Sequence, residues 1–377
     1  MKIIHISIAS PFNLEMNYQE NQFLRFHQSE GHEVILITSC YEYSGSKIVK
    51  VNSGITLIDS KTKVIRMEYR FTIIKFLANK IRAVKGLYNL LKLEKPDIIY
   101  HHSLNTLELL TIKKYLDQKK TRFIVDTHAD ENNSGKTPLS KKILHKLFYK
   151  SIIKRVYSSI DEIYYVSTEA KKFLTEMYSI PSSKMFFLPL GSEFLPETNY
   201  YSIRDRVRSE LKIGEKELLI CLAGKFNFIK KTQLVLDSIK EIKHFSATLV
   251  LVGSFDSQIN VNNYLDHPKI KYLGWKSMDA LREILVASDI YLQPGSQSII
   301  MQEAACMRNA LVLYPHVNYK NIFSDDDVFY VENSDQLKYF LHHEVKNYES
   351  INTKREASYQ VAKIKLDNHK NFSEIFN

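Results

Sequence analysis

Cysteine is scarce in this sequence, and long apolar runs are missing. Only three cysteines occur among 377 residues, Cys40, Cys221 and Cys306, and no two of them form a CxxC pair. An odd number of isolated thiols does not build a disulfide framework, so the sequence predicts a protein of the reducing cytosol. No apolar run has the length of a bilayer span, and the opening MKIIHISIAS is too strand-like for a signal peptide. These absences favour a cytoplasmic protein.

Several chemical motifs are also missing. The sequence holds no GxxxxGK[ST] phosphate loop, no HxxxH pair or carboxylate cluster typical of a metal site, and no recognisable nucleic-acid-binding module. The net charge of +10 would suit nucleic acid, an anionic membrane or anionic small molecules. Because the lysines are spread along the chain, solvated helix faces account for much of this charge. We therefore expect no metal and no nucleic-acid partner.

Two segments, 71–94 and 139–158, are both basic and amphipathic. Such segments suit a domain that rests on an anionic membrane surface and reaches a lipid-linked acceptor there. The alternative is that each helix packs its apolar face on a sheet. We favour that alternative for 71–94, and both interpretations stand for 139–158.

Short apolar strands alternate with helical segments along the whole chain. A chain of 377 residues exceeds what one hydrophobic core usually supports, so two domains are expected. A polar, helix-prone segment at 193–216 separates two such sets, and a polar helical segment at 349–377 ends the chain. Strands alternating with helices predict parallel sheets, and two sets predict two Rossmann-like α/β domains.

The predicted elements of the first half include a helix from Asn17, capped with the help of Glu20, to about Gly31, and a long helix at 71–94. The predicted strands of this half are 2–10, 32–39, 63–69, 97–103, 122–130, 162–167 and 184–190. Those of the second half are 218–224, 247–254, 269–275, 289–295, 310–315 and 328–332.

Residues just after strand ends are the candidates for binding, because ligands of parallel sheets bind beyond the carboxyl ends of the strands. In AGKFNFIKK, Gly224 ends a strand, Lys225 follows it, and Lys230 stands at the start of a helix. Two cations beside a helix N-terminus form a clamp for a diphosphate. The alternative is a pair of surface lysines at a turn.

A second candidate stretch is PGSQSIIMQE, which follows the predicted strand at 289–295. Ser296 or Ser298 is expected to cap a helix that begins near Ile299, so that the N–H groups of Ile299 and Ile300 point out of the helix start. Glu303 lies about one turn further, where a carboxylate can accept hydrogen bonds from ribose hydroxyls. The stretch predicts a nucleoside diphosphate site, and its alternative is an ordinary turn into a core helix.

The second half contains five stretches whose order resembles the nucleotide-sugar half of GT-B glycosyltransferases, most closely the retaining type of family 4. In chain order they are GK…K, LVGS, YLGW, ASDIYLQPG and EAACMRNALV. The corresponding stretches of that family are GR…KG, VGxG, an LG strand, ADVFVLPS and E-x7-E before an alanine-rich helix. The first half fits as well, since GHEVILITS stands for its second strand and VSTEAKKFL…LPLGSE is similar to VSEAxKxxL…IPNGVD. The resemblance spans most of the chain.

This resemblance implies an α/β GT-B fold, in which two Rossmann-like domains have parallel sheets that face across a cleft. The acceptor-side domain would cover residues 1–195 and the nucleotide-sugar domain residues 196–348. The terminal segment, 349–377, would then cross back to the N-terminal domain as a helix.

The resemblance also implies roles for single residues. Lys225, where the family has arginine, and Lys230 would bind the donor diphosphate, and Glu303 matches the second glutamate of E-x7-E, which holds the ribose. The first glutamate is absent, because Gly295 stands eight positions before Glu303. His128, at the end of RFIVDTHAD, matches the histidine that lies against the donor sugar.

The implied reaction moves a hexose or N-acetylhexosamine from a nucleoside-diphosphate sugar to an acceptor hydroxyl with retention, and UDP is the family's commonest nucleotide. Trp275 lies near where the base would bind. The sugar nucleotide is a co-substrate, so no cofactor or metal is expected. The partners would be a glycan or lipid-linked acceptor in cell-surface polysaccharide synthesis, at the inner face of the plasma membrane. The alternative is a catalytically silent GT-B subunit that binds a sugar nucleotide or glycan and supports a partner enzyme.

Overall fold

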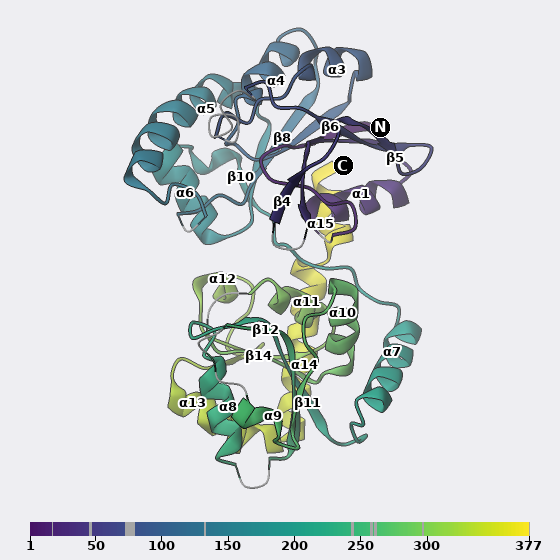
Figure 1. Cartoon of the computed structure of the whole chain (residues 1–377), viewed down its shortest axis with the longest axis vertical. Helices are drawn as coiled ribbons and strands as arrows, with labels where there is room; N and C mark the ends of the chain where they lie inside the picture. The colour runs from purple at the N-terminus through teal and green to yellow at the C-terminus, as the bar shows by residue number, and fades with distance from the viewer. Residues whose placement is uncertain are drawn as a thin grey trace. The chain divides into compact units, whose positions relative to one another are not determined.

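The computed structural model describes residues 1–16, 18–44, 47–71, 80–131, 133–242, 245–256, 259, 262–295 and 298–376. The chain divides into two compact units, Met1–Pro189 and Leu190–Asn377 (Figure 1). Each unit is an α/β layer structure with a largely parallel sheet, as the sequence predicts. In the part of the chain that is described, no helix combines the length and apolarity that crossing a membrane requires.

The sheet of the N-terminal unit has the strand order β10-β9-β8-β7-β1-β2-β6-β5. Its central strands are parallel, and only the edge strand β5 runs antiparallel, to β6. A separate antiparallel hairpin, β3 with β4, follows β2 and was not predicted. The strands are β1 (Lys2–Ser7), β2 (Glu33–Ser39), β3 (Tyr41–Ser44), β4 (Lys47–Lys50), β5 (Gly54–Leu57), β6 (Thr62–Met67), β7 (Ile98–His102), β8 (Arg122–Thr127), β9 (Glu162–Tyr165) and β10 (Met185–Phe187).

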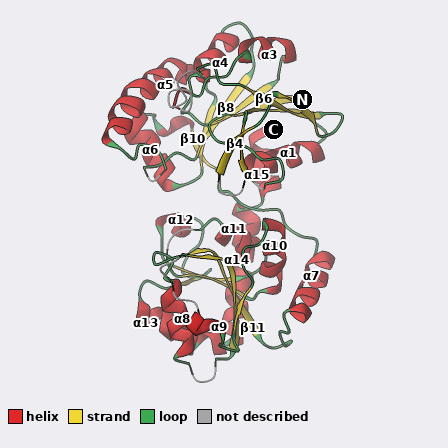
Figure 2. Cartoon of the chain, in the orientation of Figure 1, coloured by secondary structure: helices red, strands yellow, loops and turns green. Residues whose placement is uncertain are grey.

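Helices cover both faces of this sheet (Figure 2). The longest stretch joins a π-helix, η1 (Ser140–Tyr149), directly to α5 (Lys150–Val156). The other helical elements are α1 (Gln19–Ser29), α3 (Leu87–Glu94), α4 (Glu108–Leu116), η2 (Tyr157–Ser159), α6 (Thr168–Tyr178) and η3 (Ser182–Lys184).

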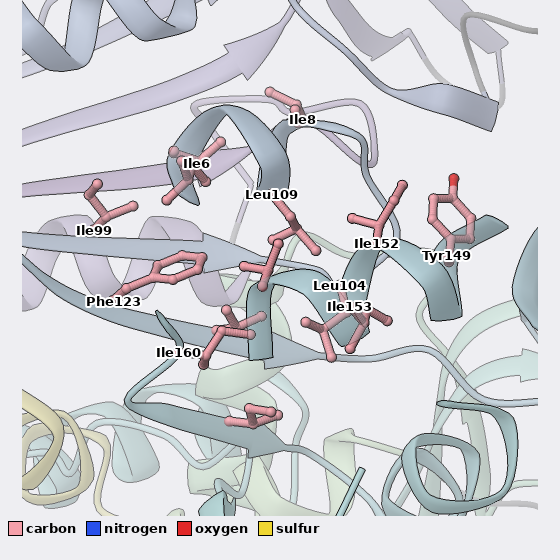
Figure 3. Close-up of a cluster of buried hydrophobic side chains, with 14 of the residues drawn as sticks. Ile6, Ile8, Ile99, Leu104, Leu109, Phe123, Tyr149, Ile152, Ile153 and Ile160 are labelled. Atoms are coloured by element: carbon pink, nitrogen blue, oxygen red, sulfur yellow. The ribbon is translucent and has the colours of Figure 1, made fainter. Parts of the chain in front are cut away.

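Strand residues alternate between two cores because successive side chains point to opposite faces of a sheet. Ile35 and Ile37 of β2 pack in the large cluster with α3, α4, α5 and α6, part of which is drawn in Figure 3. Val34 and Leu36 pack on the other face with Leu24 of α1. Burial on both faces explains why these strands are continuously apolar in the sequence.

Two predictions about the first half are wrong in detail. The long helix expected at 71–94 does not exist as one element, because Arg82 and Gly86 have positive φ angles of 52° and 84° and the helix α3 begins only at Leu87. Residues 72–79 lie outside the described residues. The first helix begins at Gln19 with Tyr18 as its N-cap, and no side chain caps it. The predicted cap, Asn17, also lies outside the described residues.

The sheet of the C-terminal unit is parallel throughout, with the order β13-β12-β11-β14-β15-β16. Counted along the chain this is the 3-2-1-4-5-6 order of dinucleotide-binding folds. The strands are β11 (Leu218–Phe226), β12 (Ala247–Phe255), β13 (Ile270–Tyr272), β14 (Ile290–Gln293), β15 (Ala310–Leu313) and β16 (Phe329–Tyr330).

The helices of this unit pack on both faces of its sheet. They are α7 (Glu197–Glu210), α8 (Thr232–Lys240), α9 (Asn262–Leu265), α10 (Met278–Ala287), α11 (Ile300–Cys306), α12 (Val317–Lys320), α13 (Ser334–His342), η4 (Glu344–Lys346), α14 (Tyr348–Lys365) and α15 (Asn368–Phe376). The predicted terminal helix is therefore two helices. Its expected return to the N-terminal domain stays a prediction.

Each sheet has one point where the strand order reverses, and ligands of open α/β sheets bind at such points. In the N-terminal unit the reversal lies between β1 and β7, and in the C-terminal unit between β11 and β14. These strands end at Ser7, His102, Phe226 and Gln293, and Gly224 lies two residues before the end of β11. Most of the predicted site residues lie on or after β11 and β14, whereas His128 follows β8 and Trp275 follows β13.

Candidate functional site

Lys230 is the most unusual charged residue of the C-terminal unit. Its side chain reaches back over the end of β11, where its Nζ donates to the Ala223 carbonyl at 3.1 Å. The residue is only 9% exposed, and in the described part of the chain no carboxylate pairs with its ammonium. Burial lowers the pKa of Lys230 to about 8. A buried cation without a counterion favours the binding of an anion beside it.

Glycines make room for this lysine. A Cβ atom on Gly224, whose φ is +119°, would lie 2.6 Å from the Lys230 Nζ. A Cβ on Gly253 would lie 1.8 Å from the Gly224 carbonyl oxygen. Side chains at these positions would therefore push the strand ends or the lysine away. Gly224, predicted as part of the binding site, thus leaves space for the Lys230 ammonium, and its contact with a ligand stays a prediction.

Gly295, which stands where the family has its first glutamate, is held against the same loop. A Cβ at this position would lie 2.3 Å from the Ile229 carbonyl oxygen and 2.6 Å from the Lys230 carbonyl carbon. Both neighbours are backbone atoms, so no side chain fits at 295 unless the 229–230 backbone moves. The present seating of the loop before α8 is thus incompatible with a glutamate at 295.

Lys225 lies inside β11 and not after it, because this strand continues to Phe226. Its side chain is exposed, whereas the Cys221 and Phe226 side chains of the same strand are buried. Lys230 precedes α8 by two residues, since the helix begins at Thr232 with Lys231 as its N-cap. The two predicted clamp lysines therefore differ: Lys225 is exposed, whereas Lys230 is buried and its ammonium is hydrogen-bonded to the Ala223 carbonyl.

The prediction that Ser298 caps α11 is wrong. The helix begins at Ile300 with Ile299 as its N-cap, and no side chain among the described residues caps it. The Ser298 N–H instead donates to the hydroxyl of Tyr319 at 2.6 Å, so α12 fixes this position. Ser296 lies outside the described residues.

Glu303 is buried on α11 and is already paired. Its Oε1 accepts from Arg282 Nε of α10 at 2.5 Å, and Arg282 Nη2 also donates to the Ser192 hydroxyl at 3.3 Å. Burial acts against the charge of Arg282, but Glu303 outweighs it and the pKa of Arg282 is raised. Arg282 holds the Glu303 carboxylate in place, and sequence reasoning missed it because nothing in α10 alone points to α11.

Trp275 follows β13 and is 66% exposed. The preceding residue, Gly274, has a φ of +68° and its carbonyl accepts from the Gly253 N–H at 2.9 Å. The indole is therefore presented to solvent from a turn that is tied to β12.

In the N-terminal unit, His128 lies one residue beyond β8 and is exposed. Its Nε2 is 2.7 Å from the Gln19 Oε1 in the first turn of α1, and the Asn133 side-chain amide donates to its carbonyl at 2.6 Å. Next to Gln19, Glu20 accepts from the Ser7 hydroxyl at 2.7 Å. Gln19, Glu20 and Ser7 were not predicted, although their place at the strand end after β1 is a signal that they could belong to a site.

Beneath His128 lies a buried chain of hydrogen bonds that crosses three neighbouring strands. Asp126 Oδ2 on β8 accepts from His102 Nδ1 on β7 at 2.8 Å, and His102 Nε2 is 3.1 Å from His5 Nδ1 on β1. His5 Nε2 is in turn 3.0 Å from His27 Nε2 on α1. All four side chains are buried. When the histidines are neutral, Asp126 orients them all, because each ring that donates toward it must accept on its other nitrogen.

The charge states along this chain follow from burial and from Asp126. Burial lowers the pKa of His5 well below its usual range and that of His27 to about 3. Burial also acts on His102, but the Asp126 carboxylate outweighs it and raises the pKa of His102. A proton that enters this row of hydrogen-bonded side chains therefore binds to His102, so that both ring N–H groups of His102 donate. His5 and His27 must then change tautomer, because His5 Nδ1 now accepts from His102.

The described residues contain no group of three or more histidines, cysteines and acids that could hold a metal ion. The candidate site is thus built from cations, glycine turns and hydroxyls. Such groups can bind an anionic, hydroxyl-rich ligand such as a sugar nucleotide.

Comparison with solved structures defines the class of fold. The chain is similar to sucrose-phosphate synthase from Thermosynechococcus elongatus, with 12% identity, a TM-score of 0.68 and coverage of 99% of this chain and 97% of that one. It is similar to HepE from Anabaena in complex with UDP, with 11% identity, a TM-score of 0.64 and coverage of 100% and 98%. It is also similar to the catalytic domain of starch synthase IV from Arabidopsis thaliana bound to ADP and acarbose, with 14% identity, a TM-score of 0.66 and coverage of 99% and 98%. The fold is GT-B.

A family match narrows this class. Residues 21–192 match the model of Glycosyltransferase Family 4, and no curated protein matches the chain. The match lies in the N-terminal unit, whereas most of the motifs that carry the resemblance lie in the C-terminal one. Together the match and the fold support a glycosyltransferase of the GT-B type.

Proposed function

We propose that the chain transfers a sugar from a nucleoside diphosphate, with UDP favoured, to an acceptor hydroxyl with retention of the anomeric configuration. The observation that carries this proposal is Lys230, a buried cation without a carboxylate partner among the described residues, at the strand-order reversal of the C-terminal sheet. The family match and the GT-B fold support the reaction class. The UDP in the HepE complex supports the choice of nucleotide.

Each part of the donor has a proposed ligand in the C-terminal unit. Lys225 and Lys230 bind the diphosphate, together with Ser296, Ser298 and the N–H groups of Ile299 and Ile300. Glu303, whose Oε1 is held by Arg282, offers its other oxygen to the ribose hydroxyls. Trp275 lies against the base. The sugar nucleotide is a co-substrate, and the proposed reaction uses no cofactor and no metal.

The proposed reaction breaks the bond from the anomeric carbon to the diphosphate and forms one to the acceptor oxygen. Negative charge grows on the leaving diphosphate, where the ammonium groups of Lys225 and Lys230 stabilise it. The leaving phosphate takes the proton of the acceptor hydroxyl, so the residues balance charge and position the reactants. In the N-terminal unit, His128 is the proposed contact to the donor sugar, positioned by Gln19.

The proposed acceptor is a glycan or a lipid-linked sugar of bacterial cell-surface polysaccharide or glycoconjugate synthesis. The transferred group is a hexose or an N-acetylhexosamine. The proposed location is the cytoplasm, at the inner face of the plasma membrane.

One observation favours a second candidate, a catalytically silent subunit that binds a sugar nucleotide or glycan for a partner glycosyltransferase. The backbone contact at Gly295 leaves no room for the glutamate that holds the donor sugar in the resembling family. Such a subunit would bind the nucleotide without turning it over.

A panel of UDP-, GDP- and dTDP-sugars tests both candidates, with binding measured by calorimetry and turnover by release of the nucleoside diphosphate. We expect Lys230→Ala to raise the barrier by about 2–4 kcal/mol, the usual effect of losing one oxyanion donor. The matched control is Lys240→Ala, an exposed lysine at the end of α8, which should leave turnover unchanged. Turnover of Lys230→Ala within a few-fold of the unchanged chain would reject the proposed role. Binding without any turnover would favour the silent subunit.

Glu303 has its own test. Glu303→Gln keeps the shape of the side chain and should mainly weaken nucleotide binding, because a neutral amide is a weaker acceptor for ribose hydroxyls. Unchanged affinity in calorimetry would reject the ribose assignment.

A further inference from the structure

The helical stretch formed by η1 and α5 has two apolar rows. One row packs into the core of the N-terminal unit and comprises His145, Tyr149, Ile152, Ile153 and Val156. The other row points outward. Leu139, Ile143 and Leu147 are spaced four residues apart and are 68%, 54% and 65% exposed. The first row already packs the helix against the core of the unit, so the second row is available to contact a partner.

Lysines run beside the outward row. Lys142, Lys146, Lys150 and Lys154 follow each other at the same spacing of four residues, and three of them are exposed. The stretch from 132 to 160 contains no acidic residue, although it holds seven basic ones, Lys136, Lys141, Lys142, Lys146, Lys150, Lys154 and Arg155. The surface is thus apolar along one line and cationic along the next, as in helices that lie at a membrane interface.

A pocket of about 330 Å³ opens where this stretch begins. Lys136, Lys141 and Lys142 line it together with Glu131, which pairs with Lys141 at 2.5 Å. One acid against three cations leaves a net positive lining, which suits the phosphate of a lipid headgroup.

We propose that Leu139, Ile143 and Leu147, with the lysines beside them, form a docking face for an anionic phospholipid bilayer. The three aliphatic side chains enter the boundary between headgroups and acyl chains, and the lysine row contacts the anionic headgroups. The charge pattern decides in favour of lipid over a second copy of the chain, because two such basic rows would repel each other across a symmetric contact.

The other basic segment, 71–94, offers no comparable face in its described part. Val84, Leu87 and Leu91 are all buried against the sheet. The packing interpretation favoured for this segment therefore fits residues 84–94, while residues 72–79 are not described.

The docking face lies in the same chain connection as His128. This connection begins at the end of β8, and Asn133 ties its first part to the His128 carbonyl. A bilayer held by η1 would bring a lipid-linked acceptor to the same chain connection of the N-terminal unit that carries His128. This last step rests on the proposed function, whereas the docking face itself does not.

Sedimentation with vesicles tests the face on the full chain. The vesicles consist of phosphatidylcholine alone or of equal parts phosphatidylcholine and phosphatidylglycerol. We expect binding to the anionic vesicles only, and a loss of at least about tenfold in the partition coefficient for the triple variant Leu139→Ser, Ile143→Ser, Leu147→Ser. The control is the double variant Leu57→Ser, Leu93→Ser, which removes leucines that are 73% and 75% exposed in the same unit and should bind as the unchanged chain does.

A second variant keeps the test decisive if the triple variant does not fold. Lys142→Glu with Lys146→Glu changes only exposed side chains and should abolish binding to anionic vesicles. Equal binding of either variant and the unchanged chain would overturn the proposal, as would binding that is equally strong to phosphatidylcholine alone or absent altogether. A chain that dimerises in sedimentation equilibrium, and becomes monomeric in the triple variant, would also overturn it in favour of a self-association face.

The same variants separate this proposal from the proposed function. Sugar-nucleotide affinity, measured by calorimetry without vesicles, should be unchanged in the triple variant. If the unchanged chain binds anionic vesicles but no sugar nucleotide, the proposed function fails and the docking face stands. If it binds the nucleotide but no vesicles, the docking face fails alone.

Discussion

The two units of the chain each bury an aspartate, and they neutralise it in different ways. Asp126 of the N-terminal unit is bonded to His102, which continues into His5 and His27. Asp289 of the C-terminal unit is bonded to Arg204, to Arg208 at 3.1 Å and to the Leu219 N–H at 2.8 Å. The first carboxylate thus pairs with a histidine, whose charge can change with pH, while the second pairs with arginines, which stay charged.

The places of the two aspartates in their sheets explain this difference. Asp289 comes just before β14, at the amino end of the strand, where it ties α7 to the sheet and is far along the strand from Gly295. Asp126 lies near the carboxyl end of β8, two residues before His128. The ion pairs of Asp289 are fixed structural contacts. The Asp126–His102 pair can change its charge and lies next to a proposed site residue. The predictions below test this contrast, from the largest expected effect to the smallest.

Removing the charge of Asp289 should have the largest effect. Asp289→Asn leaves Arg204 and Arg208 without their buried counterion, and breaking a buried ion pair costs about 3–5 kcal/mol of folding free energy. The loss should appear as faster hydrogen exchange in β11 and β14 and as a lower urea midpoint. The control is Asp326→Asn, an exposed carboxylate of the same unit. A midpoint unchanged within error would mean that the arginines do not depend on Asp289.

Acid should weaken the N-terminal unit before the C-terminal one. Burial lowers the pKa of both His27 and His101 to about 3, while the unfolded chain binds these protons near the ordinary value of about 6.5. The stability that these histidines contribute is therefore present above about pH 6.5 and is lost as the pH falls toward 3. Each contributes about 1.4 kcal/mol per pH unit in this window.

His102 has the opposite effect on the pH dependence of stability, because its pKa is raised in the folded protein. The stability that it contributes is fully present below about pH 6.5 and is lost as the pH rises through the folded pKa. Below about pH 6.5 the contribution of His102 is already complete, so it does not oppose the loss from His27 and His101, and the net trend is a loss toward acid. Hydrogen exchange of β1 and β7 should accelerate between about pH 6.5 and about pH 5 more than that of β11 and β12, after correction for the intrinsic pH dependence of exchange. Equal acceleration in both units would contradict the contrast.

Donor binding should weaken in alkali through one residue. Because burial lowers the pKa of Lys230 to about 8, the free protein loses this cation as the pH rises through that value. Affinity for a nucleoside diphosphate should fall by up to about tenfold per pH unit above about pH 8. Lys230→Arg is the control, since arginine keeps its charge and should give a flat profile in calorimetry. A wild-type profile that is also flat would reject Lys230 as a diphosphate ligand.

The smallest effect is expected from an exposed ion pair. Lys338 and Glu241 approach to 3.0 Å between α13 and the end of α8, but both side chains are well exposed. Lys338→Ala should cost less than about 1 kcal/mol, in contrast to Asp289→Asn, because solvent screens such pairs. A urea midpoint shifted as far as that of Asp289→Asn would contradict this ranking of surface against buried charge.

The sequence predicts strands well where they are buried on both faces. β1, β2, β11 and β12 are continuous apolar runs, so their patterns have no competing helical interpretation. The helix expected at 71–94 failed because helical spacing of apolar residues says nothing about backbone dihedrals. Arg82 takes a positive φ between two segments that share one periodicity.

The residues of the candidate site also differ in whether the sequence alone can predict them. Lys225, Lys230 and Glu303 could be proposed from the sequence because they lie near predicted strand ends and match positions of the family's motifs, and their roles stay predictions. Arg282 could not be found, because its partner Glu303 lies on another helix, 21 residues away. The histidine chain was equally hidden, since it depends on a register that pairs His102 with Asp126 and leaves His5, whose register partner is Tyr100, within side-chain reach of His102.

The close approach at Gly295 limits the evolutionary routes open to this protein. A glutamate at this position would meet the Ile229 carbonyl and the Lys230 backbone, so a single substitution would displace the proposed diphosphate ligand along with the loop. A carboxylate at 295 would first require the 229–230 segment to be reseated. A change of donor preference would therefore have to begin at other positions.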